Sequence, residues 1–288
     1  MRVIDILKDG RQHMSFEVFP PKKEANFESV KEATEKVAEL APSFISVTYG
    51  AGGGTSQYTL DIVSNIMKKY ALPSMAHLTC VSSSKETVLE RISEIKARGI
   101  ENVMALRGDL TPELENTDRS KWDYRYAVDL VKQIKELAPE ICIGGGCYPE
   151  VHPESPDAET DLAHLKEKVD AGCDFITTQM FFDNDIYYRF VEAANAKGIC
   201  VPVLPGILPI VRANQIQRSI EISGSFVPDE LLKLGEKYAD DPDSMKKAGI
   251  EYAIKQVRDL YDKGVKNVHI YTMNRPEVAK EIKDAFFK

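Results

Sequence analysis

The stretch Val103-Met104-Ala105-Leu106-Arg107-Gly108-Asp109 decides the fold class, because a short apolar run ends there in charged residues. Seven further apolar runs along the chain follow the same plan. Their ends are Glu17, Thr48-Tyr49, His77, Tyr148, Gln179, Pro205-Gly206 and Tyr271. Between the runs, apolar residues recur at helical spacing, as at Val88, Ile92 and Ile95. This alternation predicts an α/β fold, a (β/α)8 barrel of the TIM type, with its chemistry at the carboxyl ends of the strands.

The length of the chain fits one such barrel. A (β/α)8 barrel takes about 250 residues, so we expect a single domain over residues 1–288. About sixty residues separate Gly206 from Val265, which is more than one connecting helix needs. The spacing predicts extra helices between strands 7 and 8, with residues 214–222 and 230–238 as two of them.

Composition restricts the kinds of partner. The net charge of −8, with 37 basic residues among 45 acidic ones, argues against binding to nucleic acid. No apolar stretch reaches the roughly 20 residues of a membrane span, and charge interrupts the amino terminus too early for a signal peptide. We therefore expect a cytoplasmic protein. The five cysteines lack metal-ligand spacing and are predicted to be small buried hydrophobes.

Glu17 is the first candidate for catalysis. It follows Ser15-Phe16 and precedes Val18-Phe19-Pro20-Pro21, so its sequence neighbours are apolar. Apolar surroundings raise the pKa of a carboxyl group, which a general acid near neutral pH requires. A salt-bridged glutamate in the barrel wall is the structural alternative.

Three other motifs are candidates for ligand binding. In Arg107-Gly108-Asp109, the arginine can bind phosphate or carbonyl oxygens and the aspartate can accept from ring N–H groups, or the two can form a simple ion pair. Two prolines stiffen the segment 148–154 and so can hold Tyr148 and His152 against a ligand. His77 and His152 lack a carboxylate at ligand spacing, so we expect hydrogen bonding and no metal. The glycines of segment 50–54 lack the third glycine of a dinucleotide loop and favour either close approach of a flat ligand or a flexible turn.

Several blocks in the same order resemble methylenetetrahydrofolate reductase of the bacterial, single-domain type, from Ser15 to about Arg275. The blocks are Ser15-Phe16-Glu17 with Phe19-Pro20-Pro21, Ser46-Val47-Thr48-Tyr49-Gly50, Ala76-His77-Leu78-Thr79-Cys80, Ala105-Leu106-Arg107-Gly108-Asp109-Leu110, Tyr148-Pro149-Glu150-Val151-His152-Pro153-Glu154, Lys168-Val169-Asp170-Ala171-Gly172, Pro205-Gly206-Ile207-Leu208-Pro209 and Tyr271-Thr272-Met273-Asn274-Arg275.

The resemblance implies a flavoprotein of one-carbon metabolism and methionine biosynthesis that reduces 5,10-methylenetetrahydrofolate to 5-methyltetrahydrofolate. It implies FAD at the carboxyl end of the barrel and NAD(P)H as the electron donor, in ping-pong exchange. Glu17 would be the general acid that opens the folate's five-membered ring, and Asp109 would stabilise the cationic intermediate.

The resemblance also assigns binding residues. Those expected to contact FAD are Thr48, Tyr49, Ala51, His77, Arg107, Gly108, Asp109, Tyr126, Ala127, Tyr148, His152, Asp161 and Lys168. Those expected to face the substrates are Gln179, Tyr187, Gln215 and Arg275, the last as a partner for a folate carboxylate. Family members carry an aromatic or bulky apolar residue that sandwiches substrate against the flavin, and the matching position here is Ser219.

Two alternative functions stay open at this point. The chain can be the catalytic flavin subunit of a complex that receives electrons from an iron–sulfur partner, since it carries no cluster motif of its own. It can also be a flavin-free barrel that binds pterins or acts as a lyase. A homo-oligomer is compatible with each of these, and the choice between NADH and NADPH is not readable from the sequence.

Overall fold

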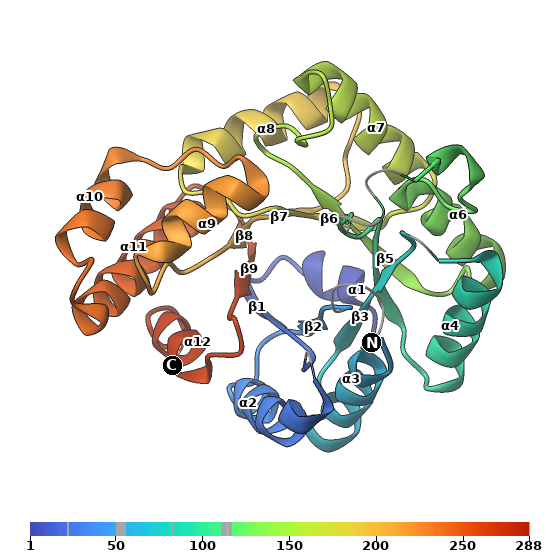
Figure 1. Ribbon diagram of the computed structural model, residues 1–288, viewed down its shortest axis with the longest axis horizontal. Helices are drawn as coiled ribbons and strands as arrows, with labels where there is room; N and C mark the ends of the chain where they lie inside the picture. The colour runs from blue at the N-terminus through green and yellow to red at the C-terminus, as the bar shows by residue number, and fades with distance from the viewer. Residues whose placement is uncertain (22, 50–55, 82, 111–113, 115–116, 288) are drawn as a thin grey trace.

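Parallel strands form a barrel with helices around it (Figure 1), in a computed structural model that describes residues 1–21, 23–49, 56–81, 83–110, 114 and 117–287. The strands are β1 (His13–Val18), β2 (Ile45–Val47), β3 (Ser74–Thr79), β4 (Asn102–Leu106), β5 (Cys142–Cys147), β6 (Phe175–Thr178), β7 (Val203–Leu204), β8 (Gly206–Ile207) and β9 (Asn267–Tyr271). The α-helices are α1 (Val3–Leu7), α2 (Phe27–Glu39), α3 (Ser56–Tyr70), α4 (Lys85–Ala97), α6 (Ala127–Leu137), α7 (Ala158–Asp170), α8 (Asn184–Ala196), α9 (Asn214–Ser223), α10 (Asp229–Lys237), α11 (Pro242–Asp262) and α12 (Pro276–Asp284), with short 3-10 turns at Glu24–Asn26 and Arg119–Lys121.

The predicted (β/α)8 barrel is confirmed, with its seventh strand split at Pro205. The described strands run in the order β7-β6-β5-β4-β3-β2-β1-β9-β8. β7 pairs with β6 and β8 pairs with β9, and only Pro205 separates β7 from β8. Proline has no N–H to donate to a ladder, so the strand breaks there. The two halves together occupy one position of the barrel and close it.

The helices between strands agree with the sequence pattern. Val88, Ile92 and Ile95 form the buried face of α4, as their spacing predicts. The extra helices predicted before the last strand are α9 and α10, and the long α11 follows them. Within the described ranges, every helix is too short or too polar to cross a membrane.

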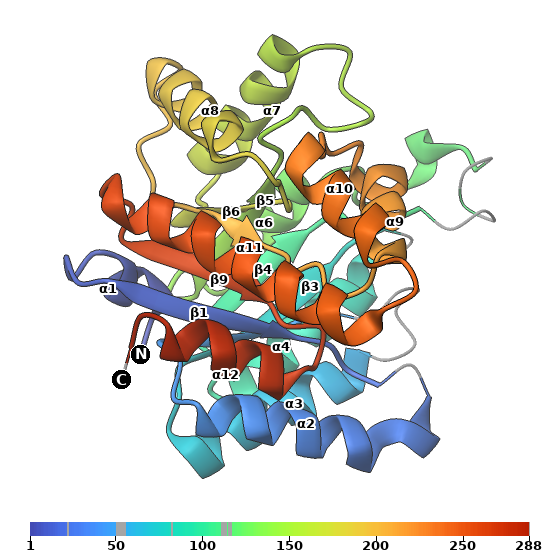
Figure 2. The same ribbon diagram turned by 90° about the vertical axis from the view of Figure 1, so that its left-hand side faces the viewer.

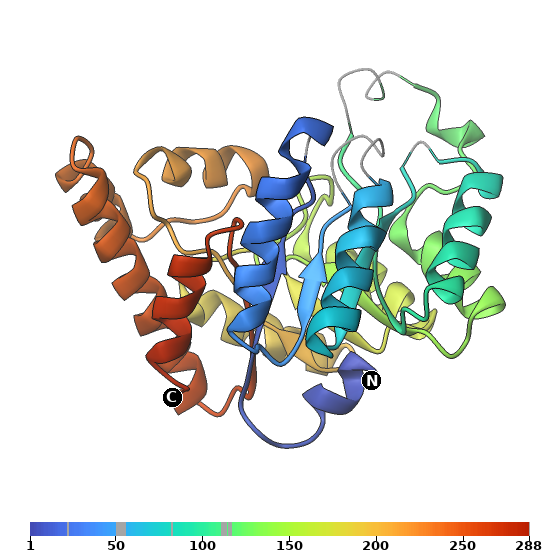
Figure 3. The same cartoon turned by 90° about the horizontal axis from the view of Figure 1, so that it is seen from below.

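Helix α1 closes the end of the barrel at which the strands begin (Figures 2 and 3). Its apolar residues Val3, Ile4, Ile6 and Leu7 join one buried cluster with side chains of the strands and their connections, Phe175 among them. A Cβ on Gly144 would lie 2.6 Å from the Phe175 ring, so a glycine is needed where that ring fills the barrel interior. The carboxyl ends of the strands form the other end of the barrel, away from α1, and we call this end its mouth.

Four of the five cysteines are buried as predicted, namely Cys80, Cys142, Cys147 and Cys173, whereas Cys200 is exposed. Burial raises the pKa of the Cys80, Cys142 and Cys147 thiols to about 12. These thiols therefore stay protonated and unreactive at neutral pH.

Candidate active site

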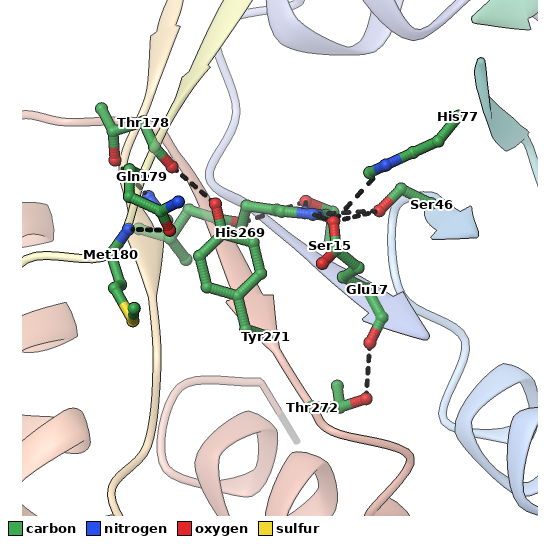
Figure 4. Close-up of polar contacts among 12 residues, drawn as sticks. Ser15, Glu17, Ser46, His77, Thr178, Gln179, Met180, His269, Tyr271 and Thr272 are labelled. Carbon is green, nitrogen blue, oxygen red and sulfur yellow. Dashed lines mark hydrogen bonds and ion pairs between the residues drawn. The ribbon is translucent and has the colours of Figure 1, made fainter. Parts of the chain in front are cut away.

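A buried carboxylate with two histidines lies inside the barrel near its mouth (Figure 4). The Oε2 atom of Glu17 lies 3.4 Å from Nε2 of His77 and 3.7 Å from Nε2 of His269. Ser46 Oγ donates to the same carboxylate oxygen at 3.3 Å and lies 3.1 Å from His269 Nε2. Ser15 Oγ lies 2.7 Å from the other ring nitrogen, Nδ1 of His269.

Strand register explains why these residues meet. Ser15 pairs with His269, and Glu17 pairs with both Tyr271 and Ser46. Successive residues of a strand point to opposite faces, so alternate positions on β1 and β9 share the interior of the barrel. Val18, the next residue after Glu17, lies in the apolar cluster between the barrel and its helices.

The expectation that the pKa of Glu17 is raised is wrong. Burial does raise the pKa of this carboxyl, but the contact with His269, the charge of His77 and the hydrogen bond from Ser46 together lower it by more, below the usual 4.5. The apolar residues next to Glu17 in sequence face the helices, while its neighbours in space are polar side chains from β2, β3 and β9. The alternative of a structural glutamate in the barrel wall thus describes its contacts, although its partners are a hydroxyl and two imidazoles and not a lysine or arginine.

Two buried polar atoms, one just after β2 and one within β3, lack hydrogen-bond partners in the described part of the chain. They are Oγ1 of Thr48 and Nε2 of His77. Burial lowers the pKa of His77, so this ring is neutral at neutral pH. A buried polar atom without a partner costs about 1–3 kcal/mol. The polar edge of a bound ligand would remove that cost at both positions.

Cationic groups lie along the rim formed by β4, β5 and α7. Arg107 forms an ion pair with Glu154 at 2.6 Å, and Lys168 donates from α7 to the carbonyl oxygen of Gly146. The guanidinium of Arg107 is also bonded to its neighbour's carbonyl, Gly108 O, at 3.2 Å. Arg107 therefore pairs with Glu154 and not with Asp109, so the simple ion pair within Arg107-Gly108-Asp109 that the sequence allowed is not the one formed. Both cations can bind a phosphate oxygen.

The loop after β5 is organised by its own side chains. The rings of Tyr148 and His152 pack edge to face at 4.5 Å. Asp161 accepts from the backbone N–H of His152 at 3.1 Å, and Glu154 donates its N–H to His152 Nδ1 at 3.0 Å. Burial and the nearby Arg107 lower the pKa of His152. Its imidazole is therefore neutral and free to donate from Nε2.

Other residues assigned by the resemblance are spread around the mouth. Asp109 is exposed at the end of β4, and Gly108 before it has φ +92°, where a Cβ would meet Val81 at 2.8 Å. Tyr126 is the N-cap residue of α6 and is 57% exposed, and Ala127 is the first residue of that helix. Tyr49 is buried at the end of β2. Ala51 and the rest of the glycine segment up to residue 55 lie outside the described residues.

Of the residues expected to face substrate, Tyr187 differs from Gln179 and Gln215 in its position. Gln179, at the end of β6, contacts the Tyr148 phenol. Gln215 accepts from the N–H groups of Val211 and Arg212, both at 2.9 Å. Tyr187 lies apart from the mouth, because it is buried in the core and donates its hydroxyl to the Val203 carbonyl at 3.0 Å.

Arg275 lies within electrostatic range of a second arginine, Arg212, that the sequence did not suggest. Burial and the charge of Arg212 lower the pKa of Arg275. Neither guanidinium forms an ion pair within the described residues. Two unpaired like charges at the same edge favour an anion between them.

Ser219, which matches the position of the family's stacking residue, is a small buried side chain, and three interior polar residues also lie in the site. Ser219 is only 2% exposed, and its hydroxyl donates to the Gln215 carbonyl within α9, so it does not face a ligand. Sequence reasoning missed Ser15, Ser46 and His269. The available signal was their polarity at alternate positions of buried strands, with His269 two residues before Tyr271.

A cavity of about 670 Å³ lies at the opposite end of the barrel, near α1 and α12. It is lined by residues such as Ile6, Met14 and Phe287, and the described residues around it include none of the predicted site residues. In barrels of this class the amino-terminal face serves stability and the carboxyl-terminal face carries the chemistry. We therefore place the site at the mouth.

The fold and the site together define an enzyme of the (β/α)8-barrel class, with buried ionisable side chains near the carboxyl ends of the strands and cationic side chains around them. Residues 2–286 match the family model described as methylenetetrahydrofolate reductase, and the chain belongs to this family of reductases.

Relatives with known names agree with this assignment. The chain is 37% identical to 5,10-methylenetetrahydrofolate reductase of Pectobacterium carotovorum subsp. carotovorum, over 95% of this chain and 89% of that protein. It is 35% identical to the enzyme of the same name from Escherichia coli, over 95% and 90% of the two chains. With methylenetetrahydrofolate reductase (NADH) 1 of Zea mays it shares 33% identity, over 96% of this chain and 49% of the plant protein.

Solved structures support the fold. An uncharacterized protein from Clostridium thermocellum that binds two copies of 5-methyl-5,6,7,8-tetrahydrofolic acid matches with a TM-score of 0.67 at 15% identity, covering 97% of this chain and 98% of that one. Dihydropteroate synthase from Xanthomonas albilineans matches with a TM-score of 0.53 at 14% identity, covering 96% and 92%.

Proposed function

We propose that this reductase binds FAD at the mouth of its barrel and uses NAD(P)H to reduce 5,10-methylenetetrahydrofolate to 5-methyltetrahydrofolate. Family membership supports the reaction. The buried Thr48 Oγ1 and His77 Nε2 atoms, which have no hydrogen-bond partner among the described residues, support a bound ligand with polar ring edges. The chemistry that FAD would supply when bound is hydride transfer from the nicotinamide to the folate.

Residues of the rim fit the two ends of this cofactor. Thr48 and His77 can hydrogen-bond to the ring system, because each directly follows one residue of the last β2–β3 pair, Val47 with Ala76. Arg107 and Lys168 can bind the diphosphate, and Arg107 would then exchange its ion pair with Glu154 for phosphate. Tyr148 and His152 form a rigid wall beside them.

The observation that carries the proposal is the cluster of Glu17, His77 and His269. Opening the folate's ring requires a proton at the departing nitrogen. With its pKa lowered, Glu17 is ionised at neutral pH, so it must take up a proton before it can act as the acid. A substrate that covers the mouth also excludes water, which raises the pKa of the carboxyl. Asp109 is exposed just after β4, three strands from β1, which carries Glu17. Its carboxylate can stabilise the cation that results.

Glu17→Gln tests this assignment. The amide keeps the size of the side chain but cannot deliver a proton, so reoxidation of reduced flavin by methylenetetrahydrofolate should fall by about a hundredfold or more. Reduction of the flavin by NADH or NADPH should stay within about twofold, because that half-reaction needs no acid at this position. Anaerobic stopped-flow absorbance measures both rates. Equal loss in both half-reactions would refute the role of Glu17.

The unmodified protein distinguishes the remaining alternatives in the same experiment. Flavin that is bleached by a nicotinamide nucleotide and then reoxidised by methylenetetrahydrofolate supports a self-sufficient reductase. Flavin that resists both NADH and NADPH but is reoxidised by the folate after chemical reduction points to a partner protein as donor. A colourless protein that takes up no FAD contradicts the proposal.

A further inference from the structure

The hydroxyl of Tyr271, the last residue of β9, donates to the carbonyl oxygen of Thr178, the last residue of β6, at 2.5 Å (Figure 4). These strands are separated by the position that β7 and β8 share in the barrel. One side chain thus spans a full strand position and ties two strand ends together at the mouth.

The break at Pro205 makes this contact possible. β6 pairs with β7 only through Ile176 and Thr177, so the Thr178 carbonyl lies beyond the last paired position. Gly206 instead donates its N–H to the Thr178 side chain at 2.9 Å. A Cβ on Gly206 would lie 2.4 Å from the Tyr271 hydroxyl and 2.5 Å from the Thr178 carbonyl. The glycine therefore leaves the room through which the tyrosine reaches.

Each end of this tie adjoins a group of the site. Tyr271 pairs in register with Glu17, and its ring packs edge to face against His269 at 5.6 Å. Thr178 directly precedes Gln179, whose N–H donates to the carbonyl oxygen of Cys147 in β5 at 2.7 Å, on the other side of β6. Burial raises the pKa of Tyr271 well above its usual value, so the phenol remains a donor at all working pH values.

We propose that Tyr271 is a positioning residue that fixes the distance between the Glu17 cluster and Gln179, so that a pterin held by Gln179 meets the proton source in a productive geometry. This inference rests on the proposed function. Without the hydroxyl, the Thr178 carbonyl loses its donor and the end of β6 becomes free to shift. A displacement of about 1 Å at such a position can reduce a rate by about a hundredfold.

Tyr271→Phe tests the proposal, with Tyr252→Phe as a matched control. Tyr252 lies in the same apolar cluster and also donates its hydroxyl to a carbonyl of the segment after β6, Phe182 O, at 2.7 Å. Both variants keep the ring and lose one hydrogen bond, so similar melting temperatures are expected. In Tyr271→Phe, reoxidation of reduced flavin by methylenetetrahydrofolate should fall about tenfold or more. Flavin reduction by the donor should stay within about twofold in both variants.

Two further readouts separate positioning from general loosening. Amide hydrogen exchange at Gln179 and Met180 should accelerate in Tyr271→Phe and not in Tyr252→Phe. In a double-mutant cycle, Tyr271→Phe should cost little further rate once Gln179 is alanine, because the tyrosine acts through that residue. Additive losses, or a Tyr271→Phe variant as active as Tyr252→Phe, would overturn the inference. A parent protein whose reduced flavin is not reoxidised by the folate would instead contradict the proposed function itself.

Discussion

At Glu17, one carboxylate oxygen contacts two imidazoles, and this governs how the site responds to pH. His77 is buried, and burial lowers its pKa below the usual 6.5. Glu17 has its own pKa lowered below 4.5 by these same rings and by Ser46, despite burial. Both groups take up protons more readily in the unfolded chain, so both make the folded state less stable as the pH falls.

His77→Gln should therefore weaken the dependence of the free energy of unfolding on pH in the range where His77 titrates. In the parent, the contribution of His77 is fully present above about pH 6.5 and is lost as the pH falls toward its lower folded pKa. Each pKa unit corresponds to about 1.4 kcal/mol. Urea unfolding at pH 7.5 and 5.5 measures the effect. His152 also has a lowered pKa, but it is present in both proteins and cancels in the comparison. An unchanged pH dependence in the variant would show that His77 is not held neutral by the fold.

At the scale of elements, the loops that follow β8 and β9 bring two arginines to one edge. The strands pair in parallel through Gly206 with His269 and Ile207 with Ile270, so their carboxyl ends meet at the same place. Arg212 follows β8 and Arg275 begins α12 after β9. Burial and the charge of Arg212 lower the pKa of Arg275, which indicates that the two guanidinium groups repel each other electrostatically.

This pair should bind the glutamyl carboxylates of the folate. Arg275→Ala and Arg212→Ala should each raise the KM for methylenetetrahydrofolate, by roughly tenfold for the more buried Arg275, since a hydrogen bond to a charged group contributes about 1.5–3 kcal/mol. Substrates with one and three glutamyl residues show which carboxylate each arginine meets. Arg218→Ala is the control, because Arg218 lies on exposed α9 and already pairs with Glu221 at 3.5 Å. If both variants have the same KM as the control, the two arginines do not bind the folate carboxylates.

At the scale of the whole molecule, the sequence predicted the barrel and its polar mouth but not the inner polar cluster. Apolar runs with polar ends predict strands and their carboxyl-terminal edge, because that pattern is local. The pKa of Glu17 depends on Ser46, His77 and His269, which are distant in sequence and meet only through strand register. The split at Pro205 and the tie from Tyr271 to Thr178 likewise depend on barrel closure, which no local pattern specifies.

Closure also assigns different tasks to the two ends of the barrel. The mouth holds the polar cluster, whereas α1 fills the other end with apolar side chains, and its Val3 N–H donates to the buried Asn102 side chain at 2.7 Å. Stability and chemistry should therefore respond separately to mutation.

Leu7→Ala tests this separation. Leu7 is 6% exposed in the α1 cluster, and truncation of a buried leucine costs about 2 to 5 kcal/mol. The midpoint of urea unfolding should fall accordingly, while the Kd for FAD and both flavin half-reactions, measured at a temperature where the variant is folded, stay within about twofold of the parent. Ile220→Ala, at a 37% exposed position of α9, is the control that removes an apolar side chain outside the α1 cluster. If FAD binding weakens in folded Leu7→Ala in proportion to the lost stability, the separation is wrong and packing in the α1 cluster also determines the geometry of the mouth.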